Sequence, residues 1–361
     1  MTLLTPESTR PNRVLPHARS EVSRLTHRRL YRVLTLLLLA GITLVSLIVF
    51  VRSSSTASVP AQAQAAYERE RQNWEHQFPI IHAQWASCAA SVPEGKPAEP
   101  ACGPEPDIAR DGPRLEYFYT DPRYRAADNL RVVVIAVTMA SAMLAFLLGA
   151  SSGGAEWSSR SMTLQLLWEP RRLRLLSLKW LALGLVTAVT TAANLVVGVG
   201  LGALTASFRG TWDGLDRVVD SSGRAVGALW PELAGMAGRG IVLVVVVASF
   251  GYAIATLVRN TGAALGTAFV YFAVVENAIR LALMRFAPGP YLLSTNAVAF
   301  VAPGGIDVPG RLEHVSDGQG GSYDQFVTVH VGNGRAFLAL LFYLALLAVP
   351  AVLSFTRRDV G

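Results

Sequence analysis

The sequence predicts an all-α integral membrane protein with six transmembrane helices, and three observations support this fold class. Hydrophobic residues make up 52% of the 361 residues and charged residues only 16%, whereas about a quarter of the residues in a soluble domain are charged. The mean hydropathy is positive. The apolar residues gather in six runs, each of about 20 residues, which is the length of helix that crosses a bilayer. These features exclude an ordinary soluble domain.

Each apolar run is expected to form one transmembrane helix. The third run is longer than a bilayer requires, so we expect it to tilt or to extend past the interface. The first run begins only after residue 32 and no small-residue cleavage site closely follows it, so we interpret it as a retained helix and not a cleavable signal peptide. The expected spans are residues 33–51, 132–150, 180–206, 240–258, 263–284 and 336–355.

The positions of Lys and Arg predict that both termini lie in the cytoplasm. The segments that are then inside carry fifteen Lys and Arg against five Asp and Glu, whereas the outside segments carry sixteen against nineteen over more than twice the length. This asymmetry follows the positive-inside rule, so the net charge of +7 reflects topology and we expect no nucleic-acid partner. The inside segments are 1–32, 151–179, 258–262 and 356–361, and the outside segments are 52–131, 207–239 and 285–335.

The N-terminal cytoplasmic segment ends in a predicted amphipathic helix. Residues 18–32, ARSEVSRLTHRRLYR, combine arginines with the apolar anchors Val22, Leu25 and Leu30. Such a helix lies in the membrane interface with its arginines toward anionic headgroups. A plain basic flank is the alternative.

The extracytoplasmic loops are large enough to hold structure of their own. Residues 61–78 have helical composition and are expected to continue outward from the first span, whereas the Pro- and Gly-rich stretch 88–113 is expected to be irregular. In the third outer segment, residues 325–331, QFVTVHV, alternate between apolar and polar side chains, as in a short strand.

Both cysteines of the chain, Cys88 and Cys102, fall in the first outer loop. An oxidising exterior favours a disulfide between them. Closing a loop of this size contributes roughly 3 kcal/mol in the chain-entropy model. Two unpaired thiols are the alternative.

The segment between the second and third spans carries the strongest functional signal. Residues 156–180, EWSSRSMTLQLLWEPRRLRLLSLKW, mix four arginines and one lysine with apolar side chains. Ser158 and Ser159 can cap a short helix that runs to Trp168, and Pro170 stops it. We expect a short helix along the membrane plane, a break, and re-entry into the membrane, with one face of the helix toward the cytoplasm.

This segment resembles the first cytoplasmic loop of the membrane subunits of type-2 ABC exporters. That family shows a Glu after the second span, a Thr-Leu…Leu pattern, a Pro beside an Arg, and a Lys that opens the third span. Residues 255–276, ATLVRNTGAALGTAFVYFAVVE, resemble the family's link between spans four and five, and residues 355–360, FTRRDV, resemble its C-terminus. The matching loop residues are Glu156, Thr163, Leu164, Leu167, Pro170, Arg171 or Arg172, and Lys179.

The resemblance implies that the chain is the permease subunit of an ATP-binding-cassette transporter, a family of which most members export. The short loop helix would be a coupling helix that inserts into a groove on a separate ATPase subunit. Two ATPase subunits, which bind ATP and Mg²⁺, and a second permease subunit, identical or homologous, would complete the assembly, and this chain would bind no cofactor. An interfacial elbow without a partner is the alternative. The implied coupling residues are Glu156, Met162, Thr163, Leu164, Leu167, Trp168, Pro170, Arg171 and Arg172.

The sequence offers no catalytic constellation of its own. The two lysines, Lys96 and Lys179, do not lie in a P-loop, so ATP hydrolysis is expected in a partner subunit. Residues 149–153 match the G-x-S-x-G pattern of serine hydrolases, but they end a transmembrane helix and every histidine lies outside the spans. We interpret His76 and His82 as solvated loop residues and expect no metal site.

Four polar residues fall within the predicted spans. Glu276 and Arg280 lie four residues apart on one helix face and can form an ion pair. Ionisable side chains are rare in membranes, so they should face the bundle interior, a pore or the interface. Asn277 and, in span three, Asn194 add hydrogen-bonding capacity. A polar gate or substrate contact and a structural clamp between helices both remain open.

We therefore expect a multi-pass permease in a bacterial cytoplasmic membrane, because thirty arginines beside two lysines indicate a GC-rich bacterial genome. The large outer loops favour one alternative, a polytopic membrane enzyme or an anchor with a receptor-like outer domain. A secondary transporter is a further alternative, although the sequence shows neither internal repeats nor broken helices. The sequence does not identify the cargo.

Overall fold

The computed structural model divides into two compact units, which are described separately. The larger unit contains Met1–Phe50, Arg125–Ser207 and Thr211–Gly361, and the smaller contains Val51–Tyr124 and Phe208–Gly210. The structure describes residues 14–56, 58–93, 102–119, 121–159, 161, 165, 167, 171–216, 218–220, 223–282, 288–316 and 322–357.

Six described helices are long and apolar enough to cross a membrane, which confirms the predicted number of spans. Several extend beyond the predicted apolar runs, because polar residues at the membrane edge continue the helix. Residues 283 and 284 of the predicted fifth span lie outside the described residues. The spans are α2 (Arg29–Arg52), α5 (Ala126–Ser158), α7 (Arg172–Arg209), α8 (Leu229–Val258), Thr261–Ala282, and α12 (Asn333–Arg357).

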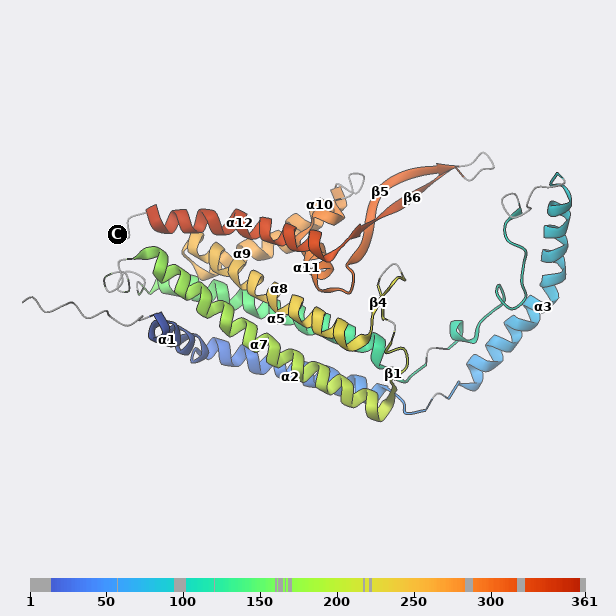
Figure 1. Cartoon of the computed structure of the whole chain (residues 1–361), viewed down its shortest axis with the longest axis horizontal. Helices are drawn as coiled ribbons and strands as arrows, with labels where there is room; N and C mark the ends of the chain where they lie inside the picture. Colours follow the sequence, from blue (N-terminus) through green and yellow to red (C-terminus); the bar gives the residue numbers. More distant parts are fainter. Residues whose placement is uncertain are drawn as a thin grey trace, which may run out of the picture. The chain divides into compact units, whose positions relative to one another are not determined.

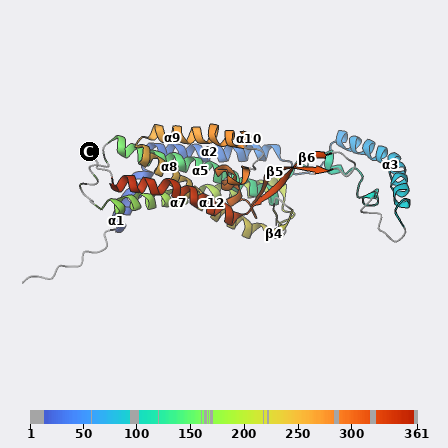
Figure 2. The ribbon, with the colours of Figure 1, turned by 90° about the horizontal axis from the view of Figure 1, so that it is seen from above.

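The larger unit is a helical bundle in which α2, α5, α7, α8 and α12 run along one another (Figures 1 and 2). The helix α1 (Val14–Thr26) and the last residues of α12 lie at one end, which we call the α1 end. Two small antiparallel strand pairs lie toward the other end, which we call the hairpin end.

Helices α5 and α8 pack with their backbones in contact because glycines face the partner helix. A Cβ atom added at Gly149 of α5 would lie 2.1 Å from the carbonyl oxygen of Ala248 in α8. A Cβ atom added at Gly251 of α8 would lie 2.3 Å from the carbonyl oxygen of Phe146 in α5. Small residues drive helix association in lipid, where the hydrophobic effect contributes little between helices. We call this contact through Gly149 and Gly251 the glycine seam, and it sets the centre of the bundle.

Span five is not one continuous α-helix. It consists of α9 (Thr261–Val270), the π-helical turn η2 (Tyr271–Val275) and α10 (Glu276–Ala282). The Asn277 side-chain amide donates to the carbonyl oxygen of Phe272 at 2.8 Å. A π-turn widens the helix and frees carbonyl groups, and Asn277 satisfies one of them. The predicted fifth span is thus one membrane-spanning segment with a π-turn inside it, a feature that the sequence did not indicate.

The predicted N-terminal amphipathic helix is two elements. Helix α1 ends at Thr26, and residues from Arg29 onward belong to α2. Leu25 is buried in a cluster of bundle residues and Val22 packs against it. Leu30, predicted as a third anchor, lies in α2 and is 44% exposed. The apolar side of α1 thus packs on the protein itself.

The hairpin end contains a buried short helix that the sequence did not indicate. Helix α11 (Leu293–Val301) follows the turn η4 (Gly289–Tyr291), and it packs into a cluster with residues of α8 and α12. The Asn333 side-chain amide, at the start of α12, donates to the carbonyl oxygens of Ala299, Phe300 and Ala302. These bonds satisfy the C-terminal carbonyls of α11, so a helix of this length stays ordered.

Two strand pairs complete the hairpin end. Strands β3 (Val218–Val219) and β4 (Ala225–Gly227) pair antiparallel. Strands β5 (Ile306–Ser316) and β6 (Ser322–Val331) form a longer antiparallel hairpin, with Ile306 opposite Val331 and an irregularity between Pro309 and Leu312. Strand β6 includes the predicted strand 325–331, whereas its partner β5 was not predicted.

The smaller unit is a long helix covered by its returning chain. Helix α3 (Ala61–Ala90) runs past the predicted end at residue 78, and it is separate from α2, which ends at Arg52. The expectation that the helix continues from the first span was therefore wrong. Pro60 precedes α3 in extended conformation, which explains the break. In the stretch 88–113, expected to be irregular, residues 88–90 belong to α3, whereas 91–93 and 103–113 are turns and irregular chain. The remaining elements are η1 (Leu115–Tyr117), β1 (Tyr124–Arg125) and β2 (Gly210–Thr211).

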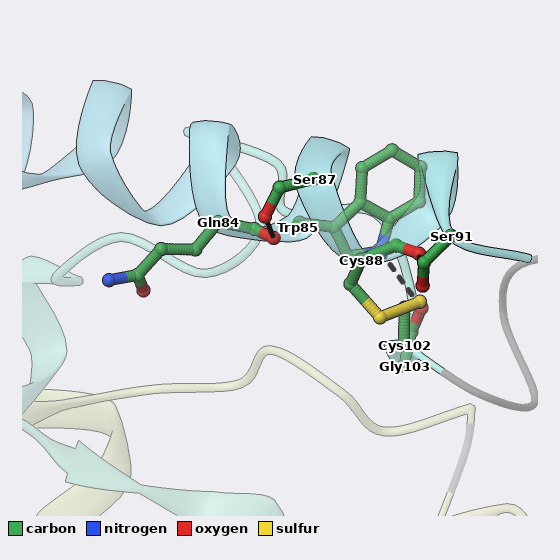
Figure 3. The surroundings of a disulfide bond; sticks show 7 residues. All are labelled: Gln84, Trp85, Ser87, Cys88, Ser91, Cys102 and Gly103. Carbon is green, nitrogen blue, oxygen red and sulfur yellow. Dashed lines mark hydrogen bonds between the residues drawn. A yellow bond between two sulfur atoms is a disulfide. The ribbon is translucent and has the colours of Figure 1, made fainter.

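The returning chain is fastened to α3 by a disulfide and by aromatic contacts. Cys88 and Cys102 are joined, and the Trp85 indole donates to the carbonyl oxygen of Gly103 at 3.1 Å (Figure 3). Tyr67 meets Phe118 edge-on, with ring centroids 6.1 Å apart. The disulfide closes a loop over a sequence separation of 14 residues, so it restricts the unfolded chain.

Both cysteines should resist alkylation in the absence of a reductant, because each sulfur is already bonded. After reduction we expect both to react, with a loss of about 3 kcal/mol of stability in the smaller unit. Mass spectrometry of the iodoacetamide-treated protein counts the modified cysteines. Alkylation of either cysteine in the unreduced protein would contradict the pairing.

Replacing Gly149 by alanine should destabilise the bundle, because the new methyl group meets the backbone of α8. Overpacking of this kind costs about 1–3 kcal/mol. The thermal unfolding midpoint in detergent measures the loss. Gly200→Ala is the matched control, since a Cβ atom there meets nothing within 4 Å. Equal midpoints for the two variants would show that the glycine seam does not limit packing.

Candidate functional site

The candidate docking segment lies at the α1 end, between the end of α5 at Ser158 and the start of α7 at Arg172. We use this name for residues 159–171. Leu167 is 77% exposed, as expected of a side chain available to a partner. The predicted coupling residues Met162, Thr163, Leu164, Trp168 and Pro170 lie outside the described residues.

The start of the docking segment differs from the prediction. Ser158 is the last residue of α5, and the N–H of Ser159 bonds to the carbonyl oxygen of Ala155, as at a helix C-terminus. The two serines therefore form the C-terminal end of the long helix α5. Helix α5 continues past residue 150, the predicted end of the second span, and reaches the docking segment at Ser158.

Glu156 lies in a buried cluster of charges and not on an exposed face. Lys179, in α7, donates to its Oε1 atom at 2.8 Å, and the same ammonium group lies 3.4 Å from Oε2 of Glu21 in α1. The Arg28 guanidinium lies 3.7 Å from Oε1 of Glu156. We call Glu21, Arg28, Glu156 and Lys179 the ion cluster. Glu156, one of the predicted coupling residues, is therefore buried within the chain and supports the segment from below.

The ion cluster ties three elements together with no net charge. Lys179 is only 4% exposed, so its ammonium group has exchanged water for two carboxylates. Removing one partner from such a cluster leaves a buried charge uncompensated, at a cost of about 3–5 kcal/mol. Helix α5 enters the docking segment and α7 leaves it, so the cluster fixes the two ends of the segment relative to each other and to α1.

Arg172 fixes the far end of the docking segment to α12. Its guanidinium donates to the carbonyl oxygens of Phe355 and Thr356, each at 3.3 Å. These carbonyls belong to the last turn of α12, where a cation is favoured by the helix dipole. Arg171 is exposed, and its carbonyl oxygen accepts the N–H of Leu175. Arg172 is thus a structural contact within the chain, and Arg171 is available to a partner.

The sequence analysis missed two members of the ion cluster, Glu21 in α1 and Arg28 in the link between α1 and α2. Glu21 and Arg28 were counted only as part of a basic amphipathic helix. A usable signal was present, because Lys179 is one of two lysines in the chain and opens an apolar span. A lone ammonium group at a membrane edge needs a carboxylate beside it.

The intramembrane residue Asn194 contacts a neighbouring helix. Its side-chain amide donates to Ser141 of α5 at 3.3 Å, and both side chains are buried. They line a small cavity between α2, α5, α7 and α8, together with Thr187 and Thr191. The lining is mostly apolar, with a few uncharged polar side chains among it, which favours a role in helix packing over binding of a charged cargo.

Glu276 is paired with a different residue from the one predicted. Its Oε1 atom accepts hydrogen bonds from the backbone N–H of Ser294, at 3.0 Å, and from the Ser294 hydroxyl. Arg280 donates to the Ser294 hydroxyl at 3.4 Å instead of pairing with Glu276. The π-turn η2 and the adjacent α11 bring Ser294 between the two charges. Glu276 is 4% exposed and connects span five to α11.

Potential metal ligands and the serines of the G-x-S-x-G stretch were located in the part of the chain that the structure describes. No group of three or more His, Cys, Asp and Glu side chains gathers among the described residues. In the G-x-S-x-G stretch, the Ser151 and Ser152 hydroxyls donate to carbonyl oxygens of their own helix. His82 lies 3.4 Å from Glu105 in the smaller unit.

Replacing Lys179 by methionine should destabilise the larger unit by about 3–5 kcal/mol, because two buried carboxylates lose their shared partner. The Lys179→Met/Glu156→Gln double variant should lose less, since it removes both sides of the shortest contact. Thermal unfolding in detergent measures both.

Arg71→Met is the control, because Arg71 forms an exposed ion pair with Glu75 in α3 and its loss should leave the midpoint unchanged. A Lys179→Met protein as stable as the Arg71→Met protein would show that the ion cluster does not hold the helices.

Comparison with known protein families agrees with this geometry and with the resemblance found in the sequence. The sequence model described as ABC-2 family transporter protein matches residues 17–360. No curated protein sequence matches the chain. The family match covers all six spans and the docking segment, and the family works with ABC ATPase subunits in the membrane. The chain therefore belongs to the ABC-2 family of transporter proteins, as a multi-pass permease component of an ABC transporter.

Proposed function

We propose that this permease exports its cargo across the cytoplasmic membrane of a bacterium. Two permease subunits would enclose the path, and two separate ATPase subunits would dock on the docking segments and bind ATP and Mg²⁺. The observation that carries the proposal is an exposed apolar side chain, Leu167, in a segment whose two ends are held rigidly by buried charges. A membrane protein that keeps such a segment outside the bundle has a surface suited to a partner.

The orientation of the bundle follows from its charges. The described residues of the arginine-rich segments 1–32 and 151–179 lie at the α1 end, and the positive-inside rule assigns these segments to the cytoplasm. The ATPase is a cytoplasmic subunit in this arrangement, so the docking segment is on its side. The hairpin end and the disulfide-bonded smaller unit are then extracytoplasmic, where a disulfide persists.

The permease has apolar surface to offer to a second copy or a homologue. The most apolar stretch of α2 is fully unburied within the chain. In span five only 11% of the corresponding stretch is buried, and in α12 only 17%. The corresponding stretches of α8, α5 and α7 are 56%, 44% and 44% buried, so these three helices form the core of the subunit and α2, span five and α12 its periphery. A dimer would cover part of this periphery and lipid the remainder.

Coupling requires that a displacement of the docking segment is passed on to the spans. It must not be lost by bending where the segment joins them. Helix α5 is continuous from the membrane to Ser158, and the ion cluster links it to α7 and α1. ATP-driven closure of the ATPases would therefore push a stiff element. The bundle would then move at its less tightly packed helices, because the glycine seam holds α5 against α8.

Replacing Leu167 by aspartate should detach the ATPase while leaving the permease in the membrane. Burying a carboxylate at an apolar contact is unfavourable, and a central contact residue contributes 2 kcal/mol or more, so we expect ATPase recovery to fall by about tenfold or more. The measurement is the ratio of ATPase to permease after affinity purification through a tag on the permease.

The control for this substitution is Ile108→Asp, which places the same charge at a half-exposed apolar position in the smaller unit. It should leave ATPase recovery unchanged. Undiminished recovery with Leu167→Asp, at normal permease levels, would count against docking through this segment.

A further inference from the structure

The short link between spans four and five contacts the last turn of α5. Helix α8 ends at Val258 and α9 begins at Thr261, so two residues join them. The guanidinium carbon of the first of these, Arg259, lies 4.3 Å from the centroid of the Trp157 ring. This distance is within the range of cation–π attraction. Trp157 is the residue before the last of α5, directly ahead of the docking segment.

Trp157 also contacts the end of span six. Its ring meets the ring of Phe355 edge-on, with centroids 6.1 Å apart, and Phe355 is buried. We call Trp157, Arg259 and Phe355 the Trp157 clamp. One side chain at the end of α5 therefore touches both the link between spans four and five and the last turn of α12.

The backbone of the link is held in a conformation that arginine rarely adopts. Arg259 has φ 54° and ψ 22°, and among the described residues it is the one non-glycine residue with positive φ. Its N–H bonds to the carbonyl oxygen of Ala255 at 2.8 Å, and Asn260 caps α9 by accepting the N–H of Ala263. Residues in this region persist where their surroundings hold them, and they concentrate at functional positions.

A second contact joins α5 to the start of span five. A Cβ atom added at Gly154 would lie 2.3 Å from the Thr261 hydroxyl oxygen and 2.4 Å from its backbone nitrogen. The end of α5 is thus in direct backbone contact with the first residue of α9. Span five is otherwise lightly packed, with 11% of its most apolar stretch buried. A shift of the end of α5 would move α9 against little resistance.

We propose that the Trp157 clamp carries movement of the docking segment into span five, with Trp157 and Arg259 as positioning residues. The proposal rests on the proposed function, because it requires an ATPase that displaces the docking segment. Arg259 holds the link over the ring, and α9 follows the link because only Asn260 intervenes. The π-turn η2 and Glu276 lie further along the same span, so movement reaches the contact with α11.

The test uses the full-length permease with its ATPase in nanodiscs and measures movement of span five directly. Spin labels are placed at Phe269→Cys in α9 and Val196→Cys in α7, which are both exposed, while the native cysteines are bonded to each other. Double electron–electron resonance gives the distance between the labels before and after ATP and vanadate. We expect the distance distribution of the parent protein to shift.

Arg259→Gly should reduce this shift by a factor of about two or more, with the ATPase still bound and hydrolysing ATP. Glycine adopts positive φ without strain, so the variant removes the guanidinium and keeps the link. Trp157→Leu should reduce the shift as well. Arg259→Lys keeps a cation over the Trp157 ring, so this variant should retain the shift in distance. Arg311→Ala, on the β5–β6 hairpin, is the control for loss of an exposed arginine and should change nothing.

An undiminished shift in both Arg259→Gly and Trp157→Leu would overturn the clamp, because a merely structural contact would alter stability and not the movement. A parent assembly whose span five does not move on ATP binding would overturn it as well. Failure of the ATPase to copurify with the parent permease contradicts the proposed function instead, so the two failures are distinguishable.

Discussion

A group of four charges at the α1 end, in which Glu156 and Lys179 are buried and Glu21 and Arg28 half-buried, is the constraint on which the permease depends. Lys179 shares its ammonium group between Glu156 and Glu21, and Arg28 balances the second negative charge. Charges that are taken out of water hold their partners firmly, because separation would leave a carboxylate or an ammonium group unpaired. The helices that enter and leave the docking segment are therefore held together at its base.

The sequence predicts those parts of the fold that depend on local composition. Apolar runs of membrane length identified six spans, since lipid requires each spanning segment to satisfy its own backbone. The elements that depend on distant contacts were not predictable. The π-turn at Tyr271–Val275 has no local signal, and α11 is stable because Asn333, more than thirty residues further on, satisfies its carbonyls. Strand β5 contains Pro309 and was recognisable only beside its partner β6.

In the candidate site as well, the sequence predicted what depends on the local pattern and missed what depends on contacts between distant residues. The loop pattern located the docking segment, and Leu167 is exposed there. The pattern could not distinguish a residue that contacts a partner from one that supports the segment, and the structure assigns Glu156 and Arg172 to support. The expected ion pair of Glu276 and Arg280 was based on helical spacing alone, which cannot foresee that Ser294 of α11 takes both partners.

The most direct test is a cryo-electron-microscopy structure of the permease with its copurified ATPase bound to ATP. The account predicts that residues 161–168 lie in a groove of the ATPase with Leu167 covered, while Lys179 still bridges Glu156 and Glu21 beneath them. A complex that hydrolyses ATP and transports, but in which these residues face solvent, would contradict the account.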